Sequence, residues 1–322
     1  MTDTRIHTRF DAGSTAADVL VDVDLTGLRA VVTGASSGLG VETARALTAA
    51  GATVTLAVRD TTAGATVAEA IARETGRQPD VRVLDLADRG SVAGFVDGWT
   101  EPLHLLVNNA GVVTSGLERT VDGRELQFAT NHLGHHALAR GLRAALATGA
   151  AERDGARVVV LSSTAHMRAG VDFEDLDFTR RDYDPQIAYA QAKTANVLFT
   201  VAATRRWADD GIVANAVNPG GIVTGLQRNF SAAQRASLAA AEAAGAFAYK
   251  SVEQGAATTM VAAVAPEFAH TGGHYLDDGN EAYTVPDTAT LVEHPHGVKA
   301  WALDPEAAER LWAVSDELTA AS

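Results

Sequence analysis

Residues 30–40 read Ala30-Val31-Val32-Thr33-Gly34-Ala35-Ser36-Ser37-Gly38-Leu39-Gly40, an apolar run followed by glycines in the spacing Gly-x3-Gly-x-Gly. Glycine accepts positive φ in a tight turn and lets the backbone approach a ligand, and the first N–H groups of a helix attract a phosphate. The segment therefore predicts a strand, a turn and a helix that form a dinucleotide site. A glycine-rich turn without a ligand is the alternative, and the loop alone does not decide between the two.

Apolar runs and helical periodicity alternate after this loop. We expect strands at 28–33, 52–58, 81–86, 103–108, 157–162, 212–217 and near 272–276. Helices are expected at 38–50, 61–75, 89–99, 122–147, 185–210 and 305–319. Such alternation predicts an α/β fold: a single doubly wound Rossmann domain whose mostly parallel seven-stranded sheet carries helices on both faces.

The two ends of the domain differ from this pattern. Residues 1–25 are mixed and polar, and we expect a partly ordered N-terminal extension before a catalytic domain at 26–322. Residues 225–270 are rich in alanine and have no strand pattern, which suggests a cap over the substrate site. Its apolar character favours a lipophilic substrate.

Composition excludes several classes of protein. The 322 residues contain no cysteine, so disulfides, thiolate zinc sites and iron–sulfur clusters are impossible. The formal charge of −14 argues against nucleic-acid partners and anionic membrane surfaces. We expect a cytoplasmic protein without a membrane anchor. His135, His136 and His166 lack zinc-type spacing, so we expect no metal and assign them to helix surfaces or supporting roles.

Polar and glycine residues recur where predicted strands end. These segments are Asp85-Leu86, Asn108-Asn109-Ala110-Gly111, Ser162-Ser163 and Asn218-Pro219-Gly220. Open α/β sheets bind their ligands at the carboxyl ends of strands. We therefore expect these segments to surround one site.

Tyr189 and Lys193 are four residues apart on a predicted helix, so their side chains share one face. The chain has only three lysines, at 193, 250 and 299. Lowering a tyrosine pKa from ~10 towards 7 requires ~4 kcal/mol. An ammonium ~5 Å away supplies ~3 kcal/mol at an effective dielectric of ~20. The sequence therefore predicts a tyrosine acid/base whose pKa is lowered by Lys193.

These motifs together resemble the short-chain dehydrogenases/reductases of compact type, over about residues 26–280. A closer resemblance, to the branch of the retinol dehydrogenases and the WW-domain oxidoreductase, rests on four segments: Asn131-His-Leu-Gly-His, Ser162-Ser-Thr-Ala-His166, 188–199 and 308–315. The resemblance implies that Ser163 holds a substrate carbonyl, that Tyr189 moves the proton and that Lys193 holds the cofactor ribose. It also implies that Asn131 holds a water beside Lys193. Family members commonly form homo-oligomers through the helices expected at 122–147 and 185–210.

Cofactor selection depends on the end of the second strand. Val58 takes the position of the acid that binds an NAD ribose, and Arg59 the adjacent position where NADP enzymes carry arginine. We expect NADP(H), with NAD(H) as the alternative, because Asp60 is more simply a helix N-cap. The expected cofactor-binding residues are Gly34, Ser36, Ser37, Gly38, Leu39, Gly40, Arg59, Asp85, Leu86, Asn109, Ala110, Gly111, Tyr189, Lys193, Pro219, Gly220, Ile222 and Thr224.

The sequence thus predicts an NADP(H)-dependent carbonyl reductase or alcohol dehydrogenase acting on a lipophilic ketone, aldehyde or secondary alcohol. Its expected catalytic residues are Asn131, Ser163, Tyr189 and Lys193. The first alternative is a non-catalytic NAD(P)-binding sensor or scaffold, which would need no proton relay. A nucleotide-sugar epimerase or dehydratase is the second, but its Gly-x-x-Gly-x-x-Gly loop is absent.

Overall fold

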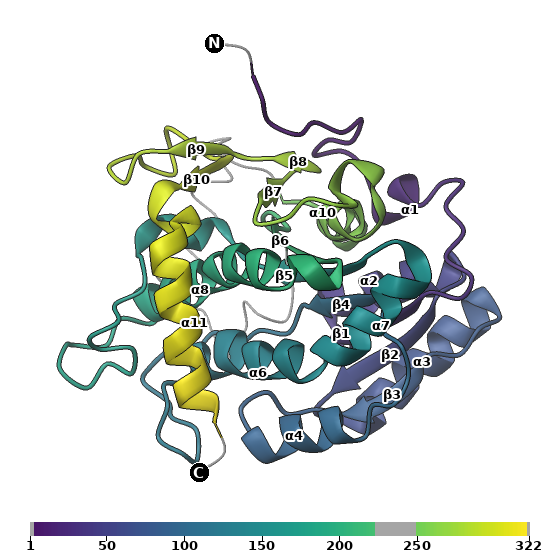
Figure 1. Cartoon of the computed structure of the whole chain (residues 1–322), viewed down its shortest axis with the longest axis horizontal. Coiled ribbons are helices and arrows are strands. Elements are labelled where there is room, and N and C mark those ends of the chain that lie inside the picture. The colour runs from purple at the N-terminus through teal and green to yellow at the C-terminus, as the bar shows by residue number, and fades with distance from the viewer. Residues whose placement is uncertain (1–2, 223–248, 321–322) are drawn as a thin grey trace.

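The computed structural model describes residues 3–222 and 249–320. Its centre is one twisted sheet with helices on both faces (Figure 1), in the strand order β3-β2-β1-β4-β5-β6-β7-β8. The strands are β1 Arg29–Thr33, β2 Thr53–Val58, β3 Asp80–Val83, β4 Leu105–Asn108, β5 Ala156–Leu161, β6 Ile212–Asn218, β7 Tyr275–Asp277 and β8 Asn280–Glu281. The predicted doubly wound fold is confirmed. The sheet has eight strands rather than seven, because β7 turns back into the antiparallel β8.

Two apolar layers hold the helices against the sheet. On one face lie α1 Ala16–Val19, α2 Gly38–Ala49, α3 Thr61–Thr75 and α10 Val252–Val264. On the other lie α4 Arg89–Asp97, α6 Gly134–Gly141, α7 Arg143–Arg153, α8 Pro185–Arg206 and α11 Pro305–Thr319. β1 lies between β2 and β4. The chain order reverses at this point, which is where such sheets place a ligand.

The single helix expected at 122–147 is wrong. The structure has instead a short α5 Leu126–Phe128, a π-helical turn Ala129–Leu133, α6, and then α7 from Arg143. Leu142 separates α6 from α7 with a ψ of 2°. The π turn contains Asn131, and π turns inside helices occur frequently at functional sites.

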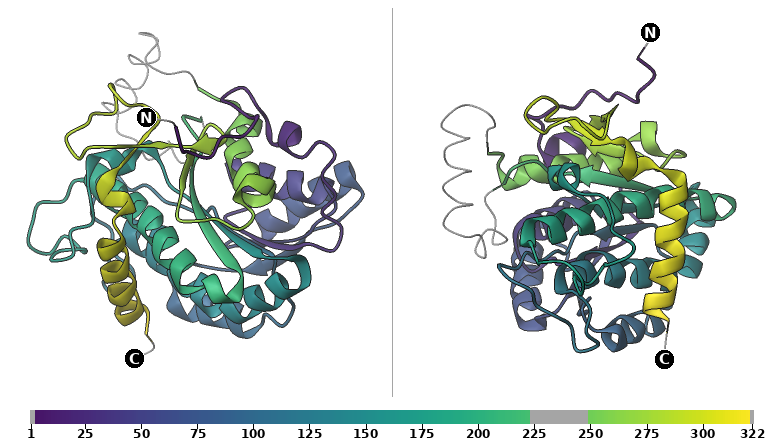
Figure 2. Two further views of the ribbon diagram at one scale, coloured as in Figure 1. Left: turned by 45° about the horizontal axis from the view of Figure 1, so that its top comes forward. Right: turned by 90° about the vertical axis from the view of Figure 1, so that its left-hand side faces the viewer.

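The last strand of the sheet and one of its faces are covered by segments outside the strand–helix alternation. The expected N-terminal extension lies against the last strand, where the Glu281 N–H donates to the carbonyl of Ile6 and the Thr8 N–H donates to Asn280 (Figure 2). Pairing of this kind protects an exposed sheet edge. α10 falls within the range expected to form the cap, yet its residues 255–263 are buried against the sheet. Residues 223–248 of that range lie outside the described part of the chain.

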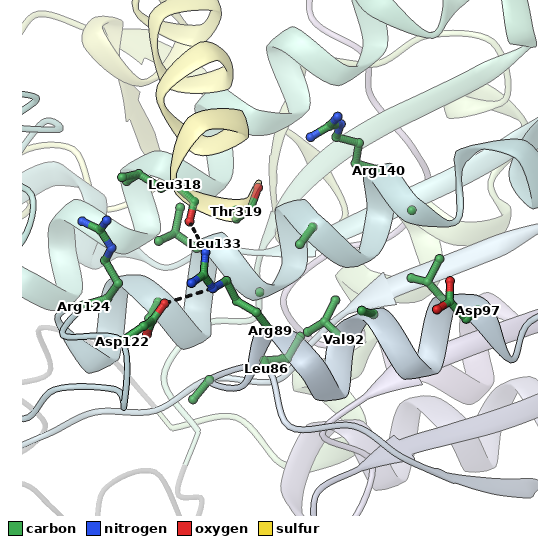
Figure 3. A pocket seen from close by; sticks show the side chains of 17 residues that line it. Leu86, Arg89, Val92, Asp97, Asp122, Arg124, Leu133, Arg140, Leu318 and Thr319 are labelled. Atoms are coloured by element: carbon green, nitrogen blue, oxygen red, sulfur yellow. Dashed lines mark hydrogen bonds and ion pairs between the residues drawn. The ribbon is translucent and has the colours of Figure 1, made fainter. Parts of the chain in front are cut away.

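α11 packs across α8 and α6 (Figure 1). Trp312 stacks on Phe199 and meets Trp207 edge to face, and both tryptophans are buried in the core. The helix end is held by Arg89, whose guanidinium donates to the carbonyls of Leu318 and Ala320 (Figure 3). The outer surface of α6 and α8 is therefore occupied by the chain itself. None of the described helices combines the length and the apolar composition needed to cross a membrane.

Candidate active site

The glycine loop packs closely against neighbouring backbone and leaves no room for larger residues at two of its glycines. Gly34 and Gly38 have φ of 67° and 56°. A Cβ on Gly40 would lie 2.6 Å from both the Asn109 amide nitrogen and the Gly34 carbonyl oxygen. A Cβ on Gly34 would likewise lie 2.9 Å from Ala110, so only glycine fits at these two positions, and the positive φ of Gly38 favours glycine there as well.

The start of α2 is open to an anion. Ser37 is its N-cap residue, yet the serine side chain makes no capping hydrogen bond. The first N–H groups of α2 therefore keep their donors for a ligand beside Ser36, Ser37 and Leu39, as a helix N-terminus that binds phosphate requires. The glycine loop and the open helix end fit the pyrophosphate of a dinucleotide.

A buried network supports the loop from behind. The Asn109 amide donates to the Thr33 carbonyl at 2.7 Å, and the N–H groups of Asn109 and Ala110 both donate to the Thr33 hydroxyl oxygen at 2.9 Å. The same hydroxyl contacts Nε2 of His135 at 2.8 Å, and Nδ1 of His135 contacts the Asn131 carbonyl. The network joins the glycine loop to the π turn.

Asn131, Lys193 and Gly111 converge beside this network. The Asn131 side chain binds the backbone of Val112 in both directions, at 2.7 and 3.0 Å. A Cβ on Gly111 would lie 3.4 Å from Oδ1 of Asn131 and 3.7 Å from Nζ of Lys193. Gly111 is exposed, so the chain surface lies within one side-chain contact of the buried Lys193 at this point.

Tyr189 lies next to both of its expected partners. Nζ of Lys193 is 5.5 Å from the centre of the Tyr189 ring, as their spacing on α8 predicts. A hydrogen bond with Ser163 favours the phenolate form of Tyr189. The Ser163 hydroxyl oxygen accepts the N–H of Ala165 at 3.1 Å, so the hydroxyl proton of Ser163 points away from Ala165. The structure therefore brings all four expected catalytic residues into one region around Gly111 and α8.

The expected lowering of the tyrosine pKa is wrong for this structure. Burial raises the pKa of Tyr189 to about 12, and the Ser163 hydrogen bond opposes this rise only in part. Burial also lowers the pKa of Lys193 to about 8. The Lys193 ammonium donates to the carbonyl of Leu161 at 2.9 Å rather than to the phenol. Tyr189 is therefore a protonated acid at neutral pH.

The expected adenosine-binding residues follow β2 and β3. Arg59 is exposed, and its side chain has no hydrogen-bond or ion-pair partner among residues 3–222 and 249–320. Asp60 is the N-cap of α3 and accepts the N–H groups of Thr62 and Ala63, which confirms the helix-cap interpretation. Asp85 is half-buried and accepts the Ala87 N–H. Its neighbour Leu86 is packed in the core.

The expected nicotinamide-binding residues follow β6. Gly220 has a φ of 84°, and a Cβ there would lie 3.1 Å from the side-chain carbons of Lys250. The ammonium of Lys250 pairs with Asp278, so this lysine supports the turn from behind. Pro219 and Ile222 belong to the same turn, whereas Thr224 lies outside the described residues.

A cavity of 360 Å³ lies away from this arrangement, between α4, α6 and the end of α11 (Figure 3). Leu86, Val92 and Leu133 contribute to its apolar floor, and charged side chains such as Arg89 and Arg140 stand at its rim. None of the four expected catalytic residues lines it. The cavity lies behind the turn that carries Leu86.

Two histidines matter more than the sequence suggested. His135, His136 and His166 are all almost fully buried, which contradicts the helix-surface interpretation and agrees with the alternative of supporting roles. His135 bridges the glycine loop and the π turn, and His166 contacts the Ser163 carbonyl at 2.7 Å. The only sequence signal was position, since each lies three or four residues after an expected catalytic residue.

An open helix N-terminus beside a tyrosine–lysine–serine group defines the class of dinucleotide-dependent oxidoreductases. Residues 29–235 match the family model described as short chain dehydrogenase. A protein of Streptomyces antibioticus named a probable oxidoreductase is 47% identical over 90% of this chain and 97% of its own length. Retinol dehydrogenase 12 of Mus musculus is 36% identical over 92% of this chain and 88% of its own length.

Solved structures agree with these relatives. An uncharacterised protein from Mycobacterium paratuberculosis superposes with a TM-score of 0.70 at 36% identity, covering 95% of this chain and 97% of that one. A Beutenbergia cavernae protein described as a candidate NAD(P)-dependent gluconate 5-dehydrogenase, with bound NADP, superposes with a TM-score of 0.64. It is 28% identical, and the match covers 80% of this chain and 97% of that one. The chain belongs to the short-chain dehydrogenase/reductase family and is an oxidoreductase that binds a nicotinamide cofactor and acts on alcohol or carbonyl groups of small molecules.

Proposed function

We propose that this protein is an NADP(H)-dependent carbonyl reductase, with Tyr189 as the proton donor. The observation that carries the proposal is the meeting of Ser163 and Lys193 at the Tyr189 side chain, next to Gly111. A bound nicotinamide supplies the hydride. Because burial keeps Tyr189 protonated at neutral pH, its side chain is in the form that must donate a proton when a ketone or aldehyde is reduced.

Each of the four residues has one task in this proposal. The Ser163 hydroxyl donates to the substrate carbonyl oxygen, and Tyr189 transfers its proton to the same oxygen as the alkoxide forms. Lys193 stabilises the phenolate that remains and holds the cofactor ribose. Asn131 fixes the backbone of Val112 beside Lys193 and orients a water molecule there. The lipophilic nature of the substrate rests on the alanine-rich sequence alone.

The test is a panel of ketones and aldehydes of increasing apolar size, assayed by loss of NADPH absorbance with NADH in parallel. We expect turnover with NADPH and rates that rise with the apolar surface of the substrate. No turnover of any carbonyl compound would contradict the proposed reaction. Equal rates with NADH would contradict only the cofactor preference.

The pH dependence of reduction should follow Lys193. The lysine carries its charge below its pKa of about 8 and loses it above, whereas Tyr189, with a pKa of about 12, stays protonated throughout. We therefore expect kcat/KM for reduction to be level from pH 6 to 7.5 and to fall about tenfold per unit above pH 8. Measurement from pH 6 to 10 at saturating NADPH checks this. A rate that stays level to pH 10 would contradict the role of the ammonium.

Replacing Arg59 by alanine should weaken NADPH binding by about 10- to 100-fold and leave NADH binding unchanged. The exposed guanidinium has no described partner to give up, and a charge-assisted bond to the 2′-phosphate contributes about 1.5–3 kcal/mol. Titration of cofactor fluorescence measures both constants. Asp60→Asn is the matched control, because asparagine also caps a helix and should not change the ratio. An unchanged ratio in Arg59→Ala would remove the argument for NADP(H).

A further inference from the structure

His166 lies directly behind the catalytic serine and connects it to the C-terminal part of the chain. It belongs to the 3-10 helix Thr164–Arg168, which begins immediately after Ser163. Its Nδ1 lies 2.7 Å from the carbonyl oxygen of Ser163, and its Nε2 lies 3.3 Å from the backbone nitrogen of Lys299. The imidazole therefore joins two segments that are far apart in the sequence.

The two partners determine the protonation of the ring. A carbonyl oxygen can only accept, so Nδ1 carries a proton, and a backbone N–H can only donate, so Nε2 carries none. His166 is thus neutral. Burial, with a smaller contribution from the charge of Lys299, lowers its pKa to about 4, although the hydrogen bond to the Ser163 carbonyl opposes this shift.

Lys299 fixes the far side of this bridge. It ends β10 Gly297–Lys299, which pairs with β9 Tyr283–Val285 in a small parallel ribbon outside the main sheet. Its buried ammonium donates to the carbonyls of Pro286, Asp287 and Ala289. The ribbon is therefore held rigidly where it meets the ring.

The near side is fixed as well. The Thr194 hydroxyl of α8 is within hydrogen-bond distance of the carbonyls of His166 and Ala169, at 3.2 and 2.6 Å. The ring of Tyr275 packs 4.7 Å from the imidazole, centre to centre. Among the described residues the Tyr275 hydroxyl has no hydrogen-bond partner, so its contribution is packing.

We propose that His166 is a positioning residue for the reaction: it holds the backbone of Ser163 so that the serine hydroxyl faces Tyr189, and it uses the β9–β10 ribbon as its support. The inference rests on the proposed role of Ser163. The Ser163 carbonyl also accepts the backbone N–H of His166 at 3.1 Å, so loss of the imidazole would leave one hydrogen bond in place of two. The weaker restraint would let the turn shift, and a displacement of about 1 Å at a reacting group can cost about 100-fold in rate.

Three replacements separate the two contacts of the His166 ring, which we call the Ser163 arm (Nδ1 to the Ser163 carbonyl) and the Lys299 arm (Nε2 to the Lys299 N–H). His166→Asn keeps a donor at the place of Nδ1 and loses the arm to Lys299, whereas His166→Gln keeps an acceptor near Nε2 and loses the arm to Ser163. His166→Leu loses both. We expect His166→Gln and His166→Leu to lower kcat by about 10- to 100-fold with unchanged NADPH affinity, and His166→Asn to stay within about threefold of the parent.

Tyr275→Phe is the matched control, because it keeps the ring stack and removes only the unpartnered hydroxyl; its kcat should stay within about twofold. Full activity in His166→Gln and His166→Leu would overturn the proposal. So would an equal loss in His166→Asn and His166→Leu, since the Ser163 arm would then not be the one that matters.

A second measurement does not depend on turnover. Nitrogen-15 NMR of the full-length protein should show the His166 ring protonated at Nδ1 and bare at Nε2 from about pH 5.5 to 8. A charged ring at pH 6, or a proton on Nε2, would overturn the bridge. Activity in Tyr189→Phe would instead overturn the proposed function and leave this spectrum unchanged, so the two failures are distinguishable.

Discussion

Turnover should fall by about 1000-fold when Tyr189 is replaced by phenylalanine, while NADPH binds as before. The change removes the phenolic proton beside Ser163 and leaves the ring next to Lys193 in place. General acid catalysis contributes about 10²- to 10⁴-fold, and this site offers no other described acid in the same position. Stopped-flow or steady-state NADPH oxidation measures the rate, and fluorescence titration measures the binding.

Tyr283→Phe is the control for loss of a phenol. Tyr283 lies in the β9–β10 ribbon and contacts Arg5 through its ring face, outside the catalytic group. Its replacement should leave turnover unchanged. Residual activity above a tenth in Tyr189→Phe would show that another group or water donates the proton.

Lys193→Met should lower turnover by at least about 100-fold without lowering the thermal stability of the protein. The ammonium stabilises the phenolate as it forms, and methionine fills a similar volume without charge. Loss of cofactor affinity should accompany the lower rate, because Lys193 is the proposed ribose donor. An active Lys193→Met would contradict the proposed mechanism.

The stability expectation follows from burial. The pKa of Lys193 falls from 10.5 to about 8 on folding, so keeping the charge buried costs about 3 kcal/mol at neutral pH. This cost is present below pH 8 and disappears above 10.5. The carbonyl of Leu161 keeps a donor in the variant, because the Asn196 amide also bonds it at 2.9 Å. The melting temperature at pH 7 should therefore stay the same or rise.

Lys299→Met gives the opposite result and serves as the contrast. Its ammonium satisfies three carbonyls of the 286–289 turn, so its removal leaves buried acceptors without a donor. The melting temperature should fall. If the melting temperature of Lys193→Met fell as much as that of Lys299→Met, Lys193 would have a structural role as well.

The local pattern predicted much of the fold because each signal acts over a few residues. Periodicity predicted the position of seven strands, and the glycine spacing predicted the turn before α2. The local pattern did not predict β8 or the break between α6 and α7 at Leu142. A two-residue strand has no periodicity, and a π turn has the same composition as the α-helix around it.

The candidate site was predicted as a set of residues, but not as an environment. Spacing alone indicated that Tyr189 and Lys193 share a face, and the distance agrees. The pKa argument failed because it counted charge and not desolvation, which depends on every atom packed around the phenol. His166 was assigned a minor place for the same reason, since its partner Lys299 is 133 residues away.

Short-range patterns were enough to predict the doubly wound sheet, the glycine loop and the proposed reacting groups, because these depend on local periodicity, backbone freedom and side-chain chemistry. The tertiary structure was needed to show which groups are buried, that α11 covers α6 and α8, and that His166 links Ser163 to a ribbon near the C-terminus. Burial and long-range contacts are sums over distant parts of the chain, and no local pattern contains them.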